Sequence, residues 1–169
     1  MEVRLSDAAA WVERLAAALR ARGASLATAE SCTGGLVAAA CTSLAGSSEW
    51  FERGFVTYSN AAKAEMLGVP AALIAAHGAV SAEVACAMAD GALRHAHAAF
   101  AVAVTGIAGP GGGTAQKPVG TVWIATAASA ASAQATLLQA TGDRAAIRDA
   151  AVVSALQLIA VRCETMTLP

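Results

Sequence analysis

The chain has 169 residues, which is enough for one domain with a substantial core, and we interpret residues 1–169 as a single domain. Its formal net charge of −1 and isoelectric point near 6.3 provide no basic surface of the kind that nucleic-acid or anionic-membrane binding needs. We therefore expect a small-molecule ligand, and neither nucleic acid nor a membrane as partner. The hydrophobic fraction of 57% and mean hydropathy of +0.57 come largely from alanine, a good helix former and a weak hydrophobe. The longest uncharged stretch, residues 118–142, alternates like strands, so we expect no membrane-spanning helix.

The N-terminal stretch MEVRLSDAAAWVERL carries acidic residues and lacks a basic segment followed by an apolar run. We therefore predict no signal peptide and a cytoplasmic protein. The four cysteines are far apart and form no CxxC pair, which favours apolar packing over a metal site or a disulfide framework. His95 and His97 are two positions apart and point in different directions on a helix, so they make a poor metal pair. We predict neither a metal nor a cofactor.

The spacing of apolar residues predicts the elements in chain order. After Ser6 and Asp7, helical spacing predicts a capped helix that ends at Gly23. Residues 25–29 indicate a strand and residues 35–44 a helix of small apolar residues. The remaining predicted elements are a strand over 50–58, a helix over 60–67 capped by Asn60, a helix over 81–96, a strand over 100–105, two strands over 119–127 and 134–140 that pair as a hairpin, and a helix over 143–164. Helices interleaved with strands, ending in an antiparallel pair, predict a layered α/β domain with a mixed sheet.

The motif AESCTGG, residues 29–35, lies in the predicted turn between the first strand and the second helix, and α/β proteins commonly place their sites at such turns. It holds three possible nucleophiles, Ser31, Cys32 and Thr33. The backbone amides of Thr33, Gly34 and Gly35 are expected to point outward, where they can hold a phosphate or a developing oxyanion. In the alternative interpretation, Ser31 or Thr33 only caps the helix and the glycines allow close packing.

The motif TYSNAAK contains Lys63, one of only two lysines among eleven basic residues. A lysine can act as a general base if partial burial lowers its pKa, whereas an arginine cannot. Tyr58, the only tyrosine, comes five residues earlier at a predicted strand end, where it can relay or orient a proton. Alternatively, Lys63 is a solvated helix residue and Tyr58 packs its ring at the edge of the sheet.

The motif TGIAGPGGG follows the buried strand over 100–105. Its glycines are spaced G-x-x-G-x-G, which matches neither the dinucleotide-binding fingerprint nor a phosphate-binding loop followed by lysine and serine. The functional interpretation is a backbone nest for an anionic or planar ligand, and the alternative is a flexible loop. The candidate binding residues are Thr105, Gly106, Gly109, Gly111 and Gly112.

Five motifs in this order, AESCTGG, VTYSNAAKAEMLGV, HGAVS, AVTGIAGPGGG and KPVGTVWIA, closely resemble the CinA C-terminal domain family, the nicotinamide-nucleotide amidohydrolases. The resemblance covers nearly the whole chain. It implies a three-layer α/β/α sandwich with a mixed, mostly parallel sheet. The activity it implies is hydrolytic deamidation of nicotinamide mononucleotide to nicotinic acid mononucleotide and ammonia, in pyridine nucleotide salvage. Some family members carry a larger N-terminal domain, for which this chain has no room.

The resemblance also implies a serine and lysine site that falls on Ser31, Tyr58 and Lys63, and it points to Arg144 and Arg148 in GDRAAIR as phosphate or carboxylate partners. No histidine lies near Cys32 in the sequence to form a thiolate pair, so we predict Ser31 as the nucleophile. Two alternatives stay open. The protein is a non-catalytic nucleotide-binding or regulatory module, or it is an amidase for another carboxamide.

A charged fraction of only 14% leaves few polar side chains to cover the surface, and Trp50 and Phe51 add large apolar groups. We therefore expect an apolar patch that is buried in a homo-oligomer, a dimer or larger, as the family resemblance also implies. The alternative is a monomer, because alanine makes the composition look more apolar than the surface is.

Overall fold

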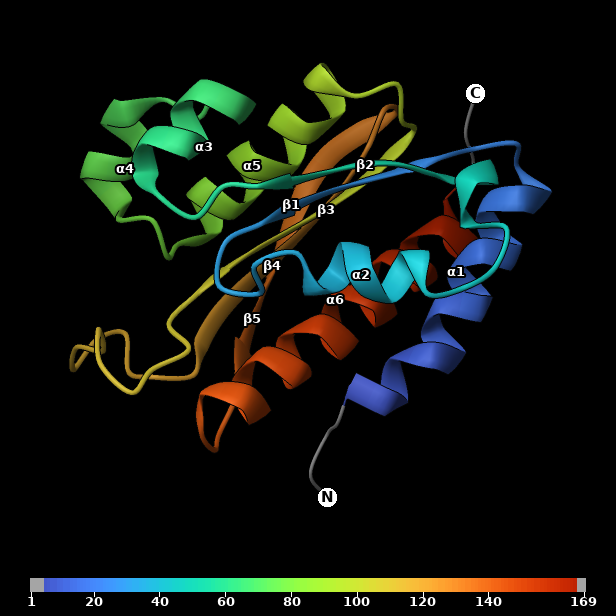
Figure 1. The fold of residues 1–169 in the computed structure, drawn as a ribbon. Coiled ribbons are helices and arrows are strands. Elements are labelled where there is room, and N and C mark those ends of the chain that lie inside the picture. Colours follow the sequence, from blue (N-terminus) through green and yellow to red (C-terminus); the bar gives the residue numbers. More distant parts are fainter. Residues whose placement is uncertain (1–4, 167–169) are drawn as a thin grey trace.

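The computed structural model describes residues 5–166 and places a five-stranded sheet between two layers of helices (Figure 1). The strands, in chain order, are β1 (Leu26–Glu30), β2 (Phe51–Val56), β3 (Phe100–Gly106), β4 (Thr121–Ala128) and β5 (Ala131–Gln139). Their order in the sheet is β2-β1-β3-β4-β5. Strand β1 is parallel to β2 and β3, whereas β4 is antiparallel to β3 and β5. Only β4 therefore runs against the other strands of this sheet, which confirms the predicted mixed, mostly parallel α/β/α sandwich.

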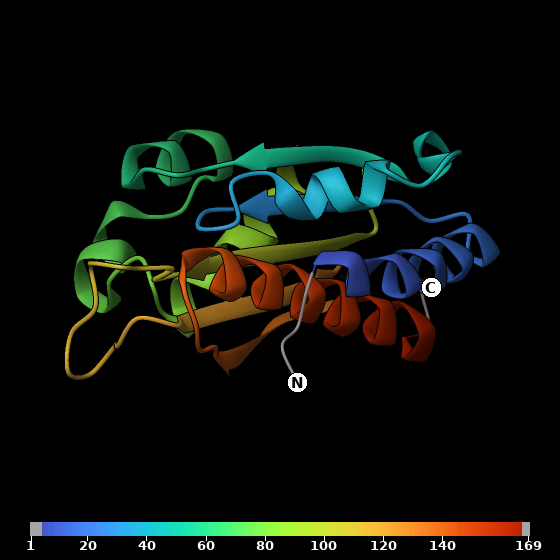
Figure 2. The same cartoon turned by 60° about the horizontal axis from the view of Figure 1, so that its bottom comes forward.

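The helices cover the two faces of the sheet in two groups (Figures 1 and 2). One face carries α1 (Ala8–Ala21), α2 (Leu36–Thr42) and α6 (Arg144–Thr165). The other face carries α3 (Asn60–Leu67), α4 (Ala71–His77) and α5 (Ala82–His95). Two short 3-10 helices, Leu5–Asp7 and Ser47–Glu49, precede α1 and β2. No helix within residues 5–166 has the length and apolar character needed to cross a membrane.

Because side chains alternate along β3, the strand places large side chains in one core and small side chains in the other. Phe100, Val102 and Val104 pack in the core beneath α1, α2 and α6, whereas Ala101 and Ala103 face the core beneath α5. Strand β4 repeats this division. On the α5 side, the buried residues of β1, β3 and β4 are therefore alanines, whose small side chains allow the helix and the sheet to approach closely.

The structure differs from the predicted elements in a few places. Helix α4 is absent from the predicted elements, and it begins directly after Pro70, whose φ of −62° suits a helix start. The cap of α3 is Ser59, whose Oγ accepts from the Ala62 amide at 3.0 Å, so the predicted cap Asn60 is wrong. Asp7 makes no side-chain capping bond to α1. Residues 1–4, part of the stretch from which we predict the absence of a signal peptide, lie outside the described residues.

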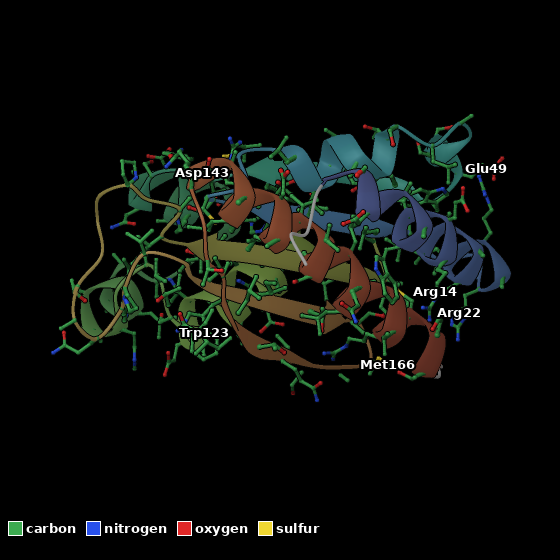
Figure 3. All side chains as sticks on the ribbon, turned by 90° about the horizontal axis from the view of Figure 1, so that it is seen from below. Arg14, Arg22, Glu49, Trp123, Asp143 and Met166 are labelled. Carbon is green, nitrogen blue, oxygen red and sulfur yellow. The ribbon has the colours of Figure 1, made fainter. Side chains whose placement is uncertain are left out.

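The parallel registers place the carboxyl ends of β1, β2 and β3 at one end of the sheet, where Glu30 pairs with both Val56 and Val104. The loop between β3 and β4 projects from this end, and α6 begins there (Figure 1). In Figure 3, Asp143 and Met166 mark the two ends of α6, and Arg14 and Arg22 lie beside the Met166 end, opposite to the ends of these strands.

Candidate active site

A cavity of about 210 Å³ opens where these strands end. Six residues that we predict from the sequence line it, namely Ser31, Tyr58, Lys63, Thr105, Gly106 and Arg144. Five others complete the lining, namely Cys32, Asn60, Ala79, Val80 and Ala108. The fold thus brings together side chains from the turn after β1, the segment after β2, α3, β3 and the start of α6.

The AESCTGG turn reverses the chain from β1 into α2. Gly34 and Gly35 have φ values of +60° and +99°, a left-handed backbone that side chains rarely tolerate, which explains the two consecutive glycines. Ser31 is 9% exposed, and its amide donates to the Val104 carbonyl oxygen of β3 at 2.9 Å. The serine is therefore anchored to the central strand of the sheet while its hydroxyl lines the cavity.

Lys63 contacts Ser31 directly. Its Nζ lies 3.1 Å from Ser31 Oγ and donates to the Thr57 carbonyl oxygen at 2.9 Å. The lysine is only 1% exposed, because α3 directs it inward beneath the serine. The contact excludes the interpretation of Lys63 as a solvated helix residue.

Burial lowers the pKa of Lys63 below its ordinary value of 10.5, since the charged ammonium loses its hydration. Among residues 5–166, no carboxylate forms an ion pair with Lys63 that would offset this effect. The neutral amine keeps a donor for Thr57 and offers its lone pair to the Ser31 hydroxyl. Geometry and electrostatics together therefore suit Lys63 to accept a proton from Ser31.

Cys32 lies next to Ser31, and its surroundings make it a weak nucleophile. Burial raises the pKa of its thiol to about 11, and the nearby Glu30 carboxylate acts in the same direction. The thiolate, which is the reactive form, is therefore scarce near neutral pH. This agrees with the choice of Ser31 over Cys32.

Tyr58 and Arg144 form the exposed side of the cavity. Arg144 donates one hydrogen bond to the Tyr58 hydroxyl at 3.0 Å and another to the Gly109 carbonyl oxygen at 2.7 Å. Tyr58 is 61% exposed, and within the described residues its hydroxyl bonds neither to Ser31 nor to Lys63. The predicted role of Tyr58 in proton transfer therefore has no direct contact to support it, whereas its place beside Arg144 suits substrate binding.

The glycine-rich loop reaches the cavity only through its first residues. Gly106 lines the cavity and ends β3, where a side chain would approach the Thr121 carbonyl oxygen to 2.9 Å. Gly109 contributes its carbonyl oxygen to Arg144 but lies outside the lining. Gly111 and Gly112 are exposed and also lie outside it, so the structure does not bring them to the cavity.

The three amides expected to hold an oxyanion differ in their surroundings. The Gly34 amide donates to the Ser31 carbonyl oxygen and the Gly35 amide to the Glu30 carboxylate, both at 3.0 Å. These two amides are therefore already used within the protein. The amides of Cys32 and Thr33, by contrast, donate to no carbonyl or carboxylate among the residues that the structure describes, and the Cys32 amide lies near its own thiol. Thr33, Gly34 and Gly35 all lie outside the cavity lining.

Two polar residues around the turn are functional candidates that sequence reasoning missed or placed elsewhere. Glu30 is 1% exposed, and its carboxylate accepts three backbone amides at the start of α2. A carboxylate at the end of a buried strand must be hydrogen-bonded. The position of Glu30 directly after the apolar residues of β1 is therefore the sequence feature that could have identified it. Arg148 bonds to the carbonyl oxygens of Cys32 and Thr33 and does not line the cavity, although we predict it from the sequence as a ligand contact. Within the described residues, no group of three or more His, Cys, Asp or Glu side chains is placed to bind a metal ion.

Comparison with known proteins agrees with these features. The CinA C-terminal domain family matches residues 8–163. The chain belongs to this family. Nicotinamide-nucleotide amidohydrolase PncC of Escherichia coli K12 is 54% identical over 147 residues, which are 87% of this chain and 89% of that protein. A CinA-like protein of Anaeromyxobacter dehalogenans is also 54% identical, and its match spans 85% of this chain and 35% of the relative.

Solved structures of the same family have the same fold. The competence/damage inducible protein CihA of Agrobacterium tumefaciens has a TM-score of 0.88 and 47% identity, covering 92% of this chain and 94% of that one. The competence damage-inducible protein A of Klebsiella pneumoniae has a TM-score of 0.90 and 37% identity, covering 95% of this chain and 99% of that one. These likenesses extend over both helical layers and the whole sheet.

Proposed function

We propose that this family member is an amidohydrolase that converts nicotinamide mononucleotide to nicotinic acid mononucleotide and ammonia. The observation that carries the proposal is the 3.1 Å contact between Ser31 Oγ and the buried Nζ of Lys63, at the wall of a cavity. The name of the Escherichia coli relative supports the substrate. Hydrolysis of a carboxamide needs a nucleophile, a base and an oxyanion site, and the first two are in contact here.

In the first half of the reaction, neutral Lys63 accepts the proton of Ser31 Oγ as this oxygen attacks the carboxamide carbon. The carbonyl oxygen becomes an oxyanion beside the turn, where the amide of Cys32 donates to no carbonyl or carboxylate among the described residues. The tetrahedral intermediate collapses when Lys63 returns the proton to the amide nitrogen. The carbon–nitrogen bond breaks, ammonia leaves, and Ser31 carries the acyl group as an ester.

The second half repeats these steps with water. Lys63 accepts a proton from the water that attacks the ester carbon, and the second tetrahedral intermediate releases Ser31. The proton returns to Ser31 Oγ, and the product is a carboxylic acid, which loses its own proton to the released ammonia or to water and leaves as a carboxylate. The balance is one water consumed and one ammonia released, and these residues need no metal ion to complete it.

The rest of the substrate lies toward the cavity mouth in this proposal. The cavity volume of about 210 Å³ is below the range of about 300–1,000 Å³ that is common for ligand pockets, so it suits the nicotinamide ring rather than the whole nucleotide. The exposed Arg144 guanidinium is then the partner of the phosphate, because charged donors bind phosphate oxygens strongly. Tyr58 and the start of the glycine-rich loop complete the walls.

The same proposal includes the setting of the reaction. The product is a nicotinic acid nucleotide, which suits pyridine nucleotide salvage in the cytoplasm, as we predict from the sequence. Trp50, which we expect from the sequence to contribute to an apolar surface patch, is buried. We still infer self-association, through β2, an edge strand of the sheet with one unpaired side. Val56 at its end and Met66 on the adjacent α3 are large apolar residues with 46% and 40% of their surface exposed.

A screen for ammonia release tests the proposal. The purified protein is incubated with nicotinamide mononucleotide, nicotinamide, glutamine or NAD, each with and without a chelator. We expect ammonia from nicotinamide mononucleotide in both conditions. Ammonia from another carboxamide alone would indicate a different amidase, and nucleotide binding without ammonia from any compound would indicate a binding module. Activity that a chelator removes and zinc or magnesium restores would overturn the metal-free mechanism.

A further inference from the structure

We propose that Glu30 and Arg148 are positioning residues that hold the turn around Ser31 so that the amide of Cys32, a residue that lines the cavity, binds the oxyanion. The inference rests on the proposed function, because it assumes that Ser31 attacks a carbonyl carbon. It goes beyond it by assigning a task to two charged side chains that do not line the cavity. Both bond to the backbone of one short segment from opposite ends.

Glu30 fixes the end of the turn that leads into α2. Its Oε2 accepts from the amides of Gly35 and Val37, each at 3.0 Å, and its Oε1 accepts from the amide of Ala38 at 2.8 Å. The carboxylate is 1% exposed, so water does not compete for these bonds. Because it takes the amides at the start of α2, this helix end offers no free donors to a ligand.

Arg148 fixes the first part of the turn from α6. Its Nε donates to the Cys32 carbonyl oxygen and its terminal Nη2 donates to the Thr33 carbonyl oxygen, both at 3.1 Å. These contacts cross more than a hundred positions of the sequence, since α6 lies against the turn only in the folded protein. A planar guanidinium that binds two successive carbonyl groups sets the orientation of both peptide units.

Because each peptide unit is planar, a hydrogen bond that fixes a carbonyl group also fixes the direction of the amide in the same peptide unit. In a trans peptide, the carbonyl of one residue and the amide of the next point in opposite directions. Arg148 draws the Cys32 carbonyl toward itself, so the Thr33 amide must point away from the guanidinium. The Ser31 carbonyl is held in the same way by the Gly34 amide at 3.0 Å, which fixes the Cys32 amide.

The contacts of Glu30 and Arg148 therefore determine which backbone amides of the turn can bind a ligand. The amides of Gly34 and Gly35 are used internally, whereas the amide of Cys32, which lines the cavity, donates to no carbonyl or carboxylate among the described residues. In α/β-hydrolases, the amide of the residue after the nucleophilic serine is one of the oxyanion donors. Small errors in the position of such donors reduce turnover strongly, so residues that hold them affect the rate without touching substrate.

The test compares a carboxamide with the matching thiocarboxamide. Thionicotinamide mononucleotide places a sulfur atom, a weak hydrogen-bond acceptor, where the oxyanion would form, so an ordered oxyanion site favours the carboxamide. We expect Glu30→Gln and Arg148→Lys to lower kcat for nicotinamide mononucleotide by about 10- to 100-fold with little change in KM. We also expect both to lower the ratio of carboxamide to thiocarboxamide kcat/KM, a change that a general loss of structure would not produce.

Arg162→Lys is the matched control. Arg162 also lies on α6 and donates to two backbone carbonyls, those of Thr126 and Ser132, but far from the cavity. Its substitution should leave the ratio at the value of the unsubstituted protein. If Glu30→Gln loses its cooperative thermal transition, the test of the inference uses Arg148→Lys alone, because this substitution keeps the charge and most of the side chain.

Measurement of Ser31→Ala in the same experiment distinguishes failure of the proposed mechanism from failure of the inference about Glu30 and Arg148. Turnover that survives in Ser31→Ala would overturn the role of Ser31 in the proposed function, and the inference with it, whereas no turnover by the unsubstituted protein would overturn the proposed function itself. An inactive Ser31→Ala together with an unchanged ratio in the folded turn variants would overturn the inference alone. A lowered ratio in both turn variants, with the Arg162 control unchanged, supports it.

Discussion

Lys63 Nζ lies 3.1 Å from Ser31 Oγ in the interior, at the wall of a cavity that opens at the end of the sheet. The serine belongs to the turn after β1 and the lysine to the helix after β2, so the parallel pairing of these two strands brings them together. The contact joins a hydroxyl to an amine whose pKa burial lowers. The first two predictions below depend on this contact.

Removal of the lysine amine should stop proton transfer. Lys63→Met keeps the length of the buried side chain, so we expect a cooperative thermal transition and a kcat for nicotinamide mononucleotide lower by about 10²- to 10⁴-fold. The matched control is Lys117→Met. Lys117 also donates to a backbone carbonyl, that of His77 at 2.7 Å, but outside the cavity. A kcat for Lys63→Met close to that of the control would remove Lys63 from the mechanism.

The lowered pKa of Lys63 predicts how activity depends on pH. Only the neutral amine can accept the Ser31 proton, so kcat/KM should rise with pH and reach its plateau below 10.5, the ordinary lysine value. Lys63→Arg should be inactive over the whole range, because an arginine stays protonated. A limb that rises only above 10.5 would show that the pKa of Lys63 is not lowered.

The same shift predicts a change in stability. Between the lowered pKa of folded Lys63 and 10.5, the unfolded chain binds more protons than the folded one, so the free energy of unfolding should rise with pH in this window. Lys63→Met lacks the titrating amine and should lack this part of the rise. Denaturant unfolding of both proteins at several pH values measures the difference. Parallel curves for the two proteins would contradict the prediction.

Arg144 should distinguish a nucleotide from a nucleoside. If its guanidinium binds the phosphate, Arg144→Gln should reduce kcat/KM for nicotinamide mononucleotide by about 10- to 100-fold, and reduce that for nicotinamide riboside much less. Arg20→Gln is the control, since Arg20 is an exposed arginine that bonds to Glu49 away from the cavity. An equal loss for both substrates would assign Arg144 to holding Tyr58 and Gly109 rather than the phosphate.

Self-association should depend on the β2 edge. Light scattering at micromolar concentration should give a mass at least twice the 16.7 kDa of one chain, and Val56→Glu should lower it. Val161→Glu is the control, because Val161 on α6 is similarly exposed, at 42% compared with 46% for Val56. A mass near one chain for the unsubstituted protein at all concentrations would contradict the inference, and an equal effect of both substitutions would move the interface away from β2.

The sequence predicts the layers of the fold well because the hydrophobic periods are clear in most elements. Helix α4 is the exception, since seven residues after Pro70 are too short for a periodic signal and the proline suggests a stop. Of the predicted site residues, Gly111, Gly112 and Arg148 lie outside the cavity, whereas local motifs do predict Ser31 and Lys63, which line it. Their contact cannot be derived from spacing, because it depends on two strands pairing across a stretch of 32 residues.

The hydrogen-bond partners of the turn amides are also impossible to predict from the local sequence. A glycine-rich turn before a helix suggests free amides, yet the buried Glu30 takes those at the start of α2. The partners of the remaining turn groups come from far along the chain, with Arg148 lying 116 positions after Cys32. Which amides stay free is therefore a property of tertiary packing, and a local motif does not contain it.

The proposed mechanism depends most directly on Ser31 as the nucleophile, and turnover of nicotinamide mononucleotide by Ser31→Ala tests this role. Release of ammonia is measured for the unsubstituted protein, Ser31→Ala and Cys32→Ala under identical conditions. We predict that Ser31→Ala lowers kcat by about 10⁴-fold or more while Cys32→Ala remains active, because burial keeps the Cys32 thiol protonated. Ammonia release by Ser31→Ala near the unsubstituted rate would contradict the account.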